Sequence, residues 1–253
     1  MSVQGNSLKN PNPIFSTDEE LKQISSIIKQ YLRLPFSKGA IPGSVMEAAL
    51  GYVRGAEIKQ TYDFVDVVKP ESRVGWQVKS TKVDTPLTWK RAKIPNSDEL
   101  IKASRLGPKA IQHIGDSIIN FCNKHAQDSI TEYELDFIGL ARLIVRPDGD
   151  LIYYEKLLCS ADNPRIFDPA EFLWEWSAPK SAGKKEQLAA LHGTHIPTGA
   201  KWWAWHGQGE NQLHFKGEKL WWPQIGDQNA IHIERTQTEP ISMQTFVEML
   251  EKI

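Results

Sequence analysis

Apolar residues recur at helical spacing in two segments near the start of the chain. Residues 1–15 form a polar, proline-bearing lead-in, and a helix is predicted from Ser16 or Thr17. Its apolar positions lie three or four residues apart, at Leu21, Ile24, Ile28 and Tyr31. A second helix is predicted from Ser44, as its N-cap, to about Gly55.

Strand-like runs separated by turn residues predict two hairpins. Thr61 to Lys69 and Arg73 to Lys82 flank a Pro-Glu-Ser turn. Leu135 to Arg146 and Leu151 to Leu158 flank Pro-Asp-Gly-Asp. These four runs supply the predicted strands of a central sheet.

Helices are predicted to separate and follow these hairpins. One runs from Ser97 to about Leu106 and another, amphipathic one begins at Pro108. Beyond residue 165 the pattern predicts two short helices, Pro169–Trp176 and Lys185–Leu191. Four strands follow, at Trp202–Trp205, Gln212–Lys216, Lys219–Trp222 and Ile231–Glu234. A last helix, Ser242–Lys252, is predicted to pack through Phe246, Met249 and Leu250. The order predicts an α/β or α+β fold with a mixed central sheet flanked by helices.

Composition narrows the possible classes of protein. The 253 residues are 40% hydrophobic and 24% charged with a net charge of −1, so a nucleic-acid partner would need a local basic patch. Cys122 and Cys159 are expected to be buried free thiols. Without an apolar leader or a membrane-length apolar run, a soluble, cytoplasmic protein is expected. Glycine-rich phosphate loops and the Gly-x-Ser-x-Gly elbow are missing from the sequence.

The first hairpin carries the candidate chemistry. Side chains alternate along a strand, so Gln77 and Lys79 project to one face while Trp76 and Val78 project to the other. A lysine on a covered sheet face needs an acid, a bound cation or both to compensate it. A three- or five-residue loop places Asp63 opposite Gln77, whereas a four-residue loop brings Asp66 to this face and turns Asp63 away. The sequence favours Asp63 and keeps Asp66 in reserve.

These residues resemble the PD-(D/E)XK nuclease superfamily, which contains most type II restriction endonucleases. The matching elements are Asp63, Gln77-Val78-Lys79 and Glu47 in the preceding helix, within residues 42–82. The chain departs from the family pattern in carrying Gln77 where that pattern has a second acid, although some family members also carry Gln or Asn there.

The resemblance implies a catalytic set of Asp63, Gln77, Lys79 and Glu47. Asp63, Gln77 and Glu47, with Asp66 in reserve, would bind Mg²⁺ through oxygen atoms. The implied activity is site-specific hydrolysis of double-stranded DNA by a homodimer, with a restriction-endonuclease-like core at residues 16–165. The Trp-rich residues 166–253 would complete this core or grip DNA.

Other interpretations of the same residues stay open. Glu47 follows Ser44 at capping-box spacing, which explains it without a metal. From Lys69 to Lys93 there are seven basic residues and two acids, and Lys82, Lys90, Arg91 and Lys93 are the predicted DNA contacts. Most tryptophans between 202 and 222 are interpreted as core residues. The rival functions are a repair or junction-resolving nuclease and a non-catalytic module that binds nucleic acid or glycan.

Overall fold

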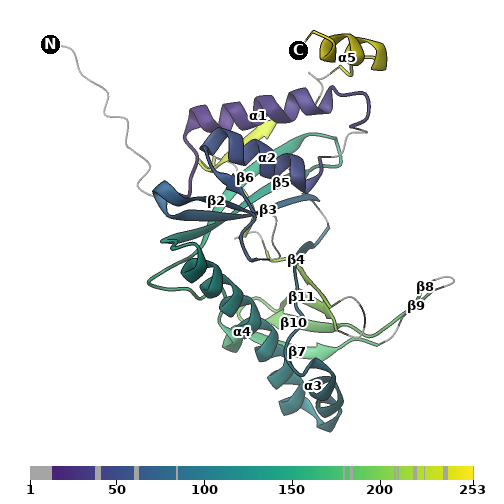
Figure 1. Ribbon diagram of the computed structural model, residues 1–253. Coiled ribbons are helices and arrows are strands. Elements are labelled where there is room, and N and C mark those ends of the chain that lie inside the picture. The colour runs from purple at the N-terminus through teal and green to yellow at the C-terminus, as the bar shows by residue number, and fades with distance from the viewer. Residues whose placement is uncertain are drawn as a thin grey trace.

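The computed structural model has an α+β fold with two main sheets (Figure 1). It describes residues 13–37, 41–59, 63–83, 85–178, 180–182, 185–207, 209, 211–218, 221–224, 226–235 and 239–252, with the backbone alone for 180–182 and 185–187. The predicted fold class and the mixed central sheet are confirmed. Within the described ranges, no helix is long and apolar enough to cross a membrane.

The first sheet contains the candidate hairpin. Its strand order is β1-β2-β3-β5-β6-β13, with bounds Glu57–Ile58, Val67–Lys69, Val74–Lys82, Phe137–Val145, Leu151–Ser160 and Ala230–Ile233. Neighbours pair antiparallel except β3 and β5, which are parallel and are joined through α4, Pro108–Glu132. A parallel pair needs such a long crossover, so α4 follows from this topology. The predicted second hairpin is confirmed as β5 and β6.

The second sheet is antiparallel throughout. Its order is β4-β12-β11-β10-β7, with bounds Leu87–Arg91, Gln212–Phe215, Ala200–His206, Leu191–His195 and Phe172–Trp176. A further hairpin consists of β8, Lys180–Ala182, and β9, Lys185–Gln187. Strand β4 comes from the range predicted as the nuclease core, whereas β13 from the C-terminal range joins the first sheet. The two ranges therefore interleave.

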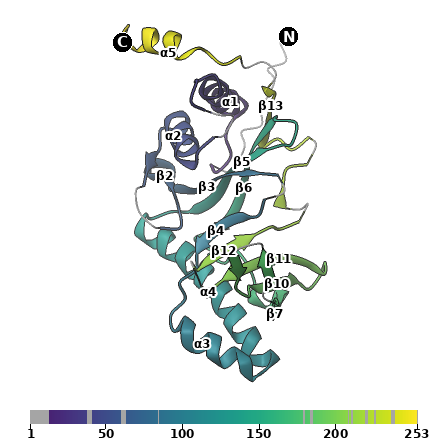
Figure 2. The ribbon, with the colours of Figure 1, turned by 90° about the vertical axis from the view of Figure 1, so that its right-hand side faces the viewer.

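Two hydrophobic clusters lie on opposite faces of the first sheet. Helices α1, Asp18–Leu32, and α2, Gly43–Arg54, cover one face, while α4 and the second sheet lie on the other side (Figures 1 and 2). Trp76 belongs to the first cluster, which lies under α1 and α2, and the second cluster lies on the side of α4. Trp203 and Trp205 are buried in the second, which bears out the core interpretation for these tryptophans. Both cysteines are buried free thiols, as predicted.

Helix starts were predicted with mixed accuracy. Thr17 and Glu20 form a reciprocal capping box at α1. Helix α2 instead begins at Gly43 with Pro42 as its N-cap and without a side-chain cap, so Ser44 does not cap it and Glu47 is outside any capping box. The predicted Ser97 helix is α3, Ser97–Ala103, continued by a 3-10 turn to Leu106.

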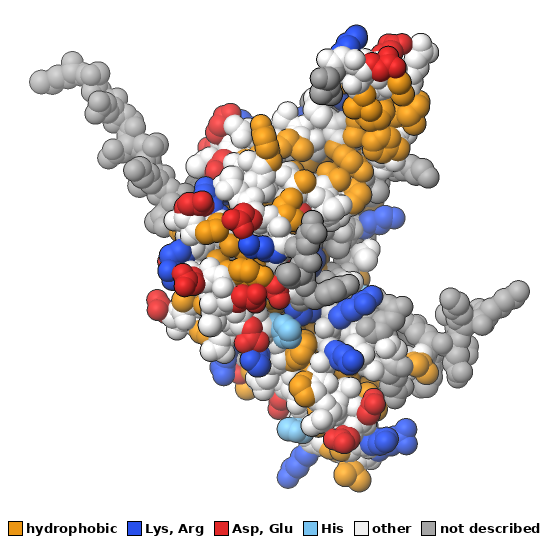
Figure 3. Space-filling model, viewed as in Figure 1, with side chains coloured by type: hydrophobic (Ala, Val, Ile, Leu, Met, Phe, Trp, Pro, Cys, Tyr) orange, Lys and Arg blue, Asp and Glu red, His pale blue; other side chains and the backbone are white. Residues whose placement is uncertain are grey.

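Several C-terminal predictions are wrong. The segments predicted as helices are strands: Pro169–Glu171 is a 3-10 turn before β7, and residues 185–195 contain β9 and β10. Trp221 and Trp222 lie in a turn, while 219 and 220 lie outside the described residues. Helix α5, Met243–Leu250, forms as predicted, and Phe246 contacts Phe36. Its Met249 and Leu250 are exposed rather than packed and belong to an apolar patch (Figure 3).

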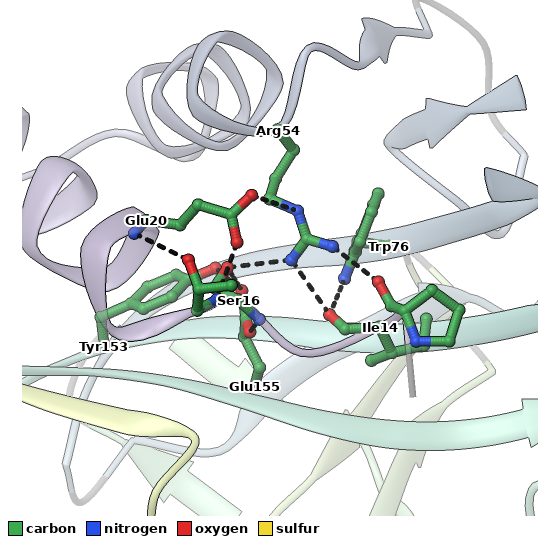
Figure 4. A network of polar contacts seen from close by, with 9 residues as sticks. Ile14, Ser16, Glu20, Arg54, Trp76, Tyr153 and Glu155 are labelled. Atoms are coloured by element: carbon green, nitrogen blue, oxygen red, sulfur yellow. Dashed lines mark hydrogen bonds and ion pairs between the residues drawn. The ribbon is translucent and has the colours of Figure 1, made fainter. Parts of the chain in front are cut away.

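A buried polar network fixes the segment before α1 to the first sheet (Figure 4). The Glu155 carboxylate on β6 accepts hydrogen bonds from Ser16 N at 2.6 Å, Ser16 Oγ at 2.7 Å and Tyr153 Oη at 2.7 Å. Arg54 donates to Ser16 Oγ at 2.9 Å and to the carbonyls of residues 13 and 14. Arg54 Nε makes no hydrogen bond among the described residues but lies 3.6 Å from Glu20 Oε1, so an ion pair completes this buried network.

Candidate functional site

Strand β3 separates a packed face from a polar face, as its alternation predicts. Trp76 and Val78 belong to the cluster under α1 and α2. Gln77 and Lys79 project toward the second sheet, together with Leu140 of the neighbouring strand. The two candidate polar residues therefore share one face.

The register of the first hairpin decides which acid lies beside them. Strands β2 and β3 pair Lys69 with Val74 and Val67 with Trp76, leaving the four-residue link 70–73. The pairing ends at Val67 and Trp76, and Asp66 lies just before β2, where its N donates to Trp76 O at 2.8 Å. The favoured placement of Asp63 opposite Gln77 does not occur. The reserve acid, Asp66, is instead the one that contacts β3, at Trp76, Val78 and Lys79.

Asp66 is tied to β3 through its side chain. Its Oδ2 accepts a hydrogen bond from Val78 N at 2.6 Å and lies 3.6 Å from Lys79 Nζ. The Asp66 and Lys79 side chains are 26% and 21% exposed, so solvent reaches this ion pair. A partly exposed pair of this kind leaves the carboxylate available to a ligand.

Gln77 is buried, and its amide group makes one hydrogen bond among the described residues. The side chain is 2% exposed, and its Nε2 donates to Trp89 O at 3.1 Å. Because a carbonyl only accepts, this bond directs Nε2 to Trp89 and leaves Oε1 for another partner. Gln77 Oε1 is buried and accepts no hydrogen bond within the described part of the chain. An orphaned buried oxygen is costly, and a bound cation or water would satisfy it.

Glu47 lies within electrostatic reach of this group from α2. Burial raises the pKa of Glu47, the Asp66 carboxylate raises it further, and the Lys79 ammonium lowers it. The upstream glutamate that the resemblance implies is thus near Asp66 and Lys79. Two nearby carboxylates repel each other, and a cation between them would relieve the repulsion.

Asp63 lies before β2 and contacts a different part of the site. Its Oδ2 accepts a hydrogen bond from Tyr133 Oη at 2.5 Å, just beyond the end of α4. Burial lowers the pKa of both Lys90 and His125, and the nearby Asp63 charge partly opposes this lowering. Asp63 therefore borders the polar cluster beside Lys90, rather than Gln77.

Lys90 belongs to the site, although the sequence suggested only a DNA contact. It lies on β4 beside a register shift and pairs with Leu213. Burial lowers the pKa of Lys90, whereas nearby Cys122 and the carboxylates Asp63 and Asp66 raise it. Lys82, Arg91 and Lys93, the other predicted contacts, are exposed, as a phosphate contact requires.

The oxygen atoms of the candidate site supply some, but not all, of the ligands that a hard cation needs. Asp66, Gln77 Oε1 and Glu47 are oxygen donors of the kind Mg²⁺ prefers, and Mg²⁺ commonly retains waters and uses substrate phosphate as further ligands. Within the described ranges, no three His, Cys, Asp or Glu side chains are grouped closely enough to hold a metal ion. A site here would need the Gln77 amide oxygen and a phosphate to complete it.

Strand β10 also carries two histidines, His192 and His195. His195 stacks on Trp202 with ring centroids 3.8 Å apart, and its Nδ1 is 2.9 Å from Thr198 Oγ1. These contacts give His195 a packing role.

Comparison with known proteins gives no further guidance: no protein-family model, curated protein or solved structure matches this chain. The site therefore has to be interpreted from its own geometry. Sequence reasoning missed Tyr133, for which no signal exists. It also missed Arg142, whose position inside the apolar run 137–145 was a usable signal, because a charged residue there must be compensated.

Proposed function

We propose that this protein hydrolyses phosphodiester bonds in double-stranded DNA with Mg²⁺. The observation that carries the proposal is that Asp66 contacts Lys79 and Val78 N on β3, next to Gln77, whose buried Oε1 accepts no hydrogen bond among the described residues. The order of helix, strand and strand with this residue set is the part that resembles the PD-(D/E)XK nucleases. Asp66 takes the place that the sequence had favoured for Asp63.

Each residue has a distinct role in the proposed reaction. Asp66 and the Gln77 amide oxygen would hold the Mg²⁺ ion, with Glu47 contributing from α2. When bound, the ion would polarise the phosphate and stabilise the charge that develops on it. Lys79, held by Asp66, would orient the attacking water or offset phosphate charge. Lys90 would add a second positive charge next to Asp63.

The finer features of the proposal follow from the resemblance. Cutting would be site-specific, as in type II restriction enzymes, and the protein would be a homodimer because one site cuts one strand. Lys82, Arg91 and Lys93 would contact the DNA backbone. Burial of Trp203 and Trp205 argues against a binding module that uses these rings.

Plasmid digestion tests this function directly. Purified protein with Mg²⁺ is expected to produce discrete fragments, and Lys79→Ala or Asp66→Asn is expected to slow cutting by at least about 100-fold, as loss of a catalytic group does. DNA binding should persist in both variants. Asp63→Asn should slow cutting less than Asp66→Asn, because Asp63 does not lie opposite Gln77.

Matched controls separate loss of chemistry from loss of folding. Lys124→Ala removes an exposed lysine paired with Asp128 on α4, and Asp148→Asn changes an exposed acid in the turn after β5; both should cut normally. A smear instead of discrete bands would favour a repair-type or non-specific nuclease. Binding without cutting under Mg²⁺ or Mn²⁺ would refute the hydrolase and favour a binding module.

A further inference from the structure

Arg142 is a buried cation with no anionic partner in the described part of the chain. The residue is 2% exposed on β5, inside an otherwise apolar strand. Its Nε and Nη2 both donate to Thr81 Oγ1, at 3.0 and 2.6 Å, and the guanidinium lies 3.9 Å from the Trp222 ring centroid. A hydroxyl and a ring orient the charge but do not neutralise it.

Among the described residues, Arg142 is buried without a counterion, which is unusual for an arginine. Burial lowers the pKa of Arg142 to about 10, so the group still carries its charge at neutral pH. The other buried arginine, Arg54, has an ion pair with Glu20 at 3.6 Å and hydrogen bonds to main-chain carbonyls. Since a buried unpaired charge destabilises a fold, its presence points to a ligand that supplies the missing anion.

The space next to Arg142 accommodates a small anionic group. A cavity of about 220 Å³ is lined by Arg142, Lys216, Thr85, Trp222 and Glu218, among others. The described lining residues include two cationic side chains and one carboxylate, which sum to a positive charge. A phosphate group fits this chemistry, because arginine presents a planar fork of donors that matches phosphate oxygens.

The cavity adjoins the candidate site across one strand pairing. Arg142 on β5 is in register with Lys79 on β3, and both project from the same face of the sheet. Neighbouring strands are about 4.8 Å apart. A bound DNA strand that passes the Asp66–Lys79 pair would therefore bring an adjacent phosphodiester within reach of Arg142.

We propose that the Arg142 cavity is a phosphate-binding subsite that holds the DNA backbone next to the bond being cut. The assignment of the phosphate to DNA rests on the proposed function, whereas the binding of an anion does not. Arg142 is a positioning residue for the scissile bond. Its neighbours Thr81 and Trp222 keep the guanidinium plane fixed toward the cavity.

The experiment measures binding without divalent ions, so that it does not depend on cutting. Fluorescence anisotropy of a labelled DNA duplex at several KCl concentrations should show that Arg142→Met weakens binding about ten- to a hundredfold, the range for losing a charge-assisted hydrogen bond. The slope of log affinity against log salt should fall by about 0.9, the value for one phosphate contact. Arg146→Met, which removes an exposed arginine paired with Asp148, should retain the wild-type slope.

Inorganic phosphate separates the two possible sources of the anion. Millimolar phosphate should raise the melting temperature of the wild type but not of Arg142→Met. Phosphate stabilisation with unchanged DNA binding would identify a small-anion site and overturn the DNA assignment. An unchanged response of the variant to both phosphate and DNA would overturn the subsite altogether.

A second variant covers the case in which Arg142→Met does not fold. Arg142→Lys keeps the charge but lacks the planar fork, so the salt slope should stay at the wild-type value while affinity falls. If affinity does not fall, the fork has no role and the proposal is wrong. If phosphate and DNA bind through Arg142 but no cutting occurs, the subsite stands and the nuclease function fails.

Discussion

Replacing Glu155 by alanine tests the buried network that anchors the start of α1. The Glu155 carboxylate is 0% exposed and accepts three hydrogen bonds, two from Ser16 and one from Tyr153 (Figure 4). Alanine leaves these donors without their acceptor and removes a buried carboxylate that interacts electrostatically with Arg54. The segment before α1 would then lose its attachment to β6.

The magnitude follows from two opposing contributions. Three hydrogen bonds to a charged acceptor contribute about 1.5–3 kcal/mol each, or about 4.5–9 kcal/mol together. Removing the carboxylate also recovers its desolvation penalty, which is several kcal/mol. We therefore expect the free energy of unfolding to fall by about 3–5 kcal/mol, the range for breaking a buried charged group. The melting temperature should fall by about 6–20 °C, at about 2–4 °C per kcal/mol for a chain of this length.

Urea unfolding followed by circular dichroism measures this loss. The matched control is Glu19→Ala, which changes an exposed acid in the first turn of α1. Its free energy of unfolding should fall by less than about 1 kcal/mol. A loss below about 1 kcal/mol in Glu155→Ala would refute the anchoring role.

The pH dependence of Glu155 has a defined sign. Burial raises the pKa of Glu155 above 4.5, although the hydrogen bonds from Ser16 and Tyr153 and the charge of Arg54 oppose this. The folded state then binds the proton more tightly than the unfolded state. The contribution of this group to stability is full below about pH 4.5 and is lost as pH rises through the folded pKa. Relative to Glu155→Gln, the wild type should thus lose stability as pH rises; a relative gain would contradict the raised pKa.

Two further predictions concern packing in the second cluster. A Cβ at Gly115 would lie 2.1 Å from the Trp174 ring, so Gly115→Ala should lower the free energy of unfolding by about 1–3 kcal/mol in urea, and an unchanged midpoint would contradict this close contact. Burial raises the pKa of Cys122 and Cys159 to about 12, so a thiol reagent should label neither in the folded protein and both in urea; rapid native labelling would contradict their burial.

The sequence predicts best where one periodicity dominates a long segment. The helices α1 and α4 and the hairpin of β5 and β6 were predicted because their apolar residues alternate or recur without interruption. β7 was mistaken for a helix, although Phe172, Trp174 and Trp176 alternate with exposed residues. Proline before this run suggested a helix start, but Pro169 begins only a 3-10 turn. Pairing with β10 decides the outcome, and such a partner is not visible in the local sequence.

The candidate site was predictable only where the alternation of side chains along a strand determines it. Alternation alone places Gln77 and Lys79 on one face. The choice between Asp63 and Asp66 depends on a link whose last residue, Arg73, has φ 54°, a left-handed conformation that sequence does not announce for arginine. The position of Lys90 depends on a register shift in the pairing of β4 with β12, and such irregularities can re-aim a side chain.

The involvement of β4 shows that the second sheet is part of the candidate site. Strand β4 belongs to that sheet, yet its Trp89 carbonyl orients the Gln77 amide and its Lys90 lies near Asp63 and Asp66. The Trp89 ring itself is 1% exposed and packs against Trp203, Phe215 and Phe167. The tryptophans of the C-terminal region therefore position the polar groups on β3 by fixing the β4 backbone. A substitution that loosens this aromatic core would move the Gln77 oxygen without changing any residue of the proposed catalytic set.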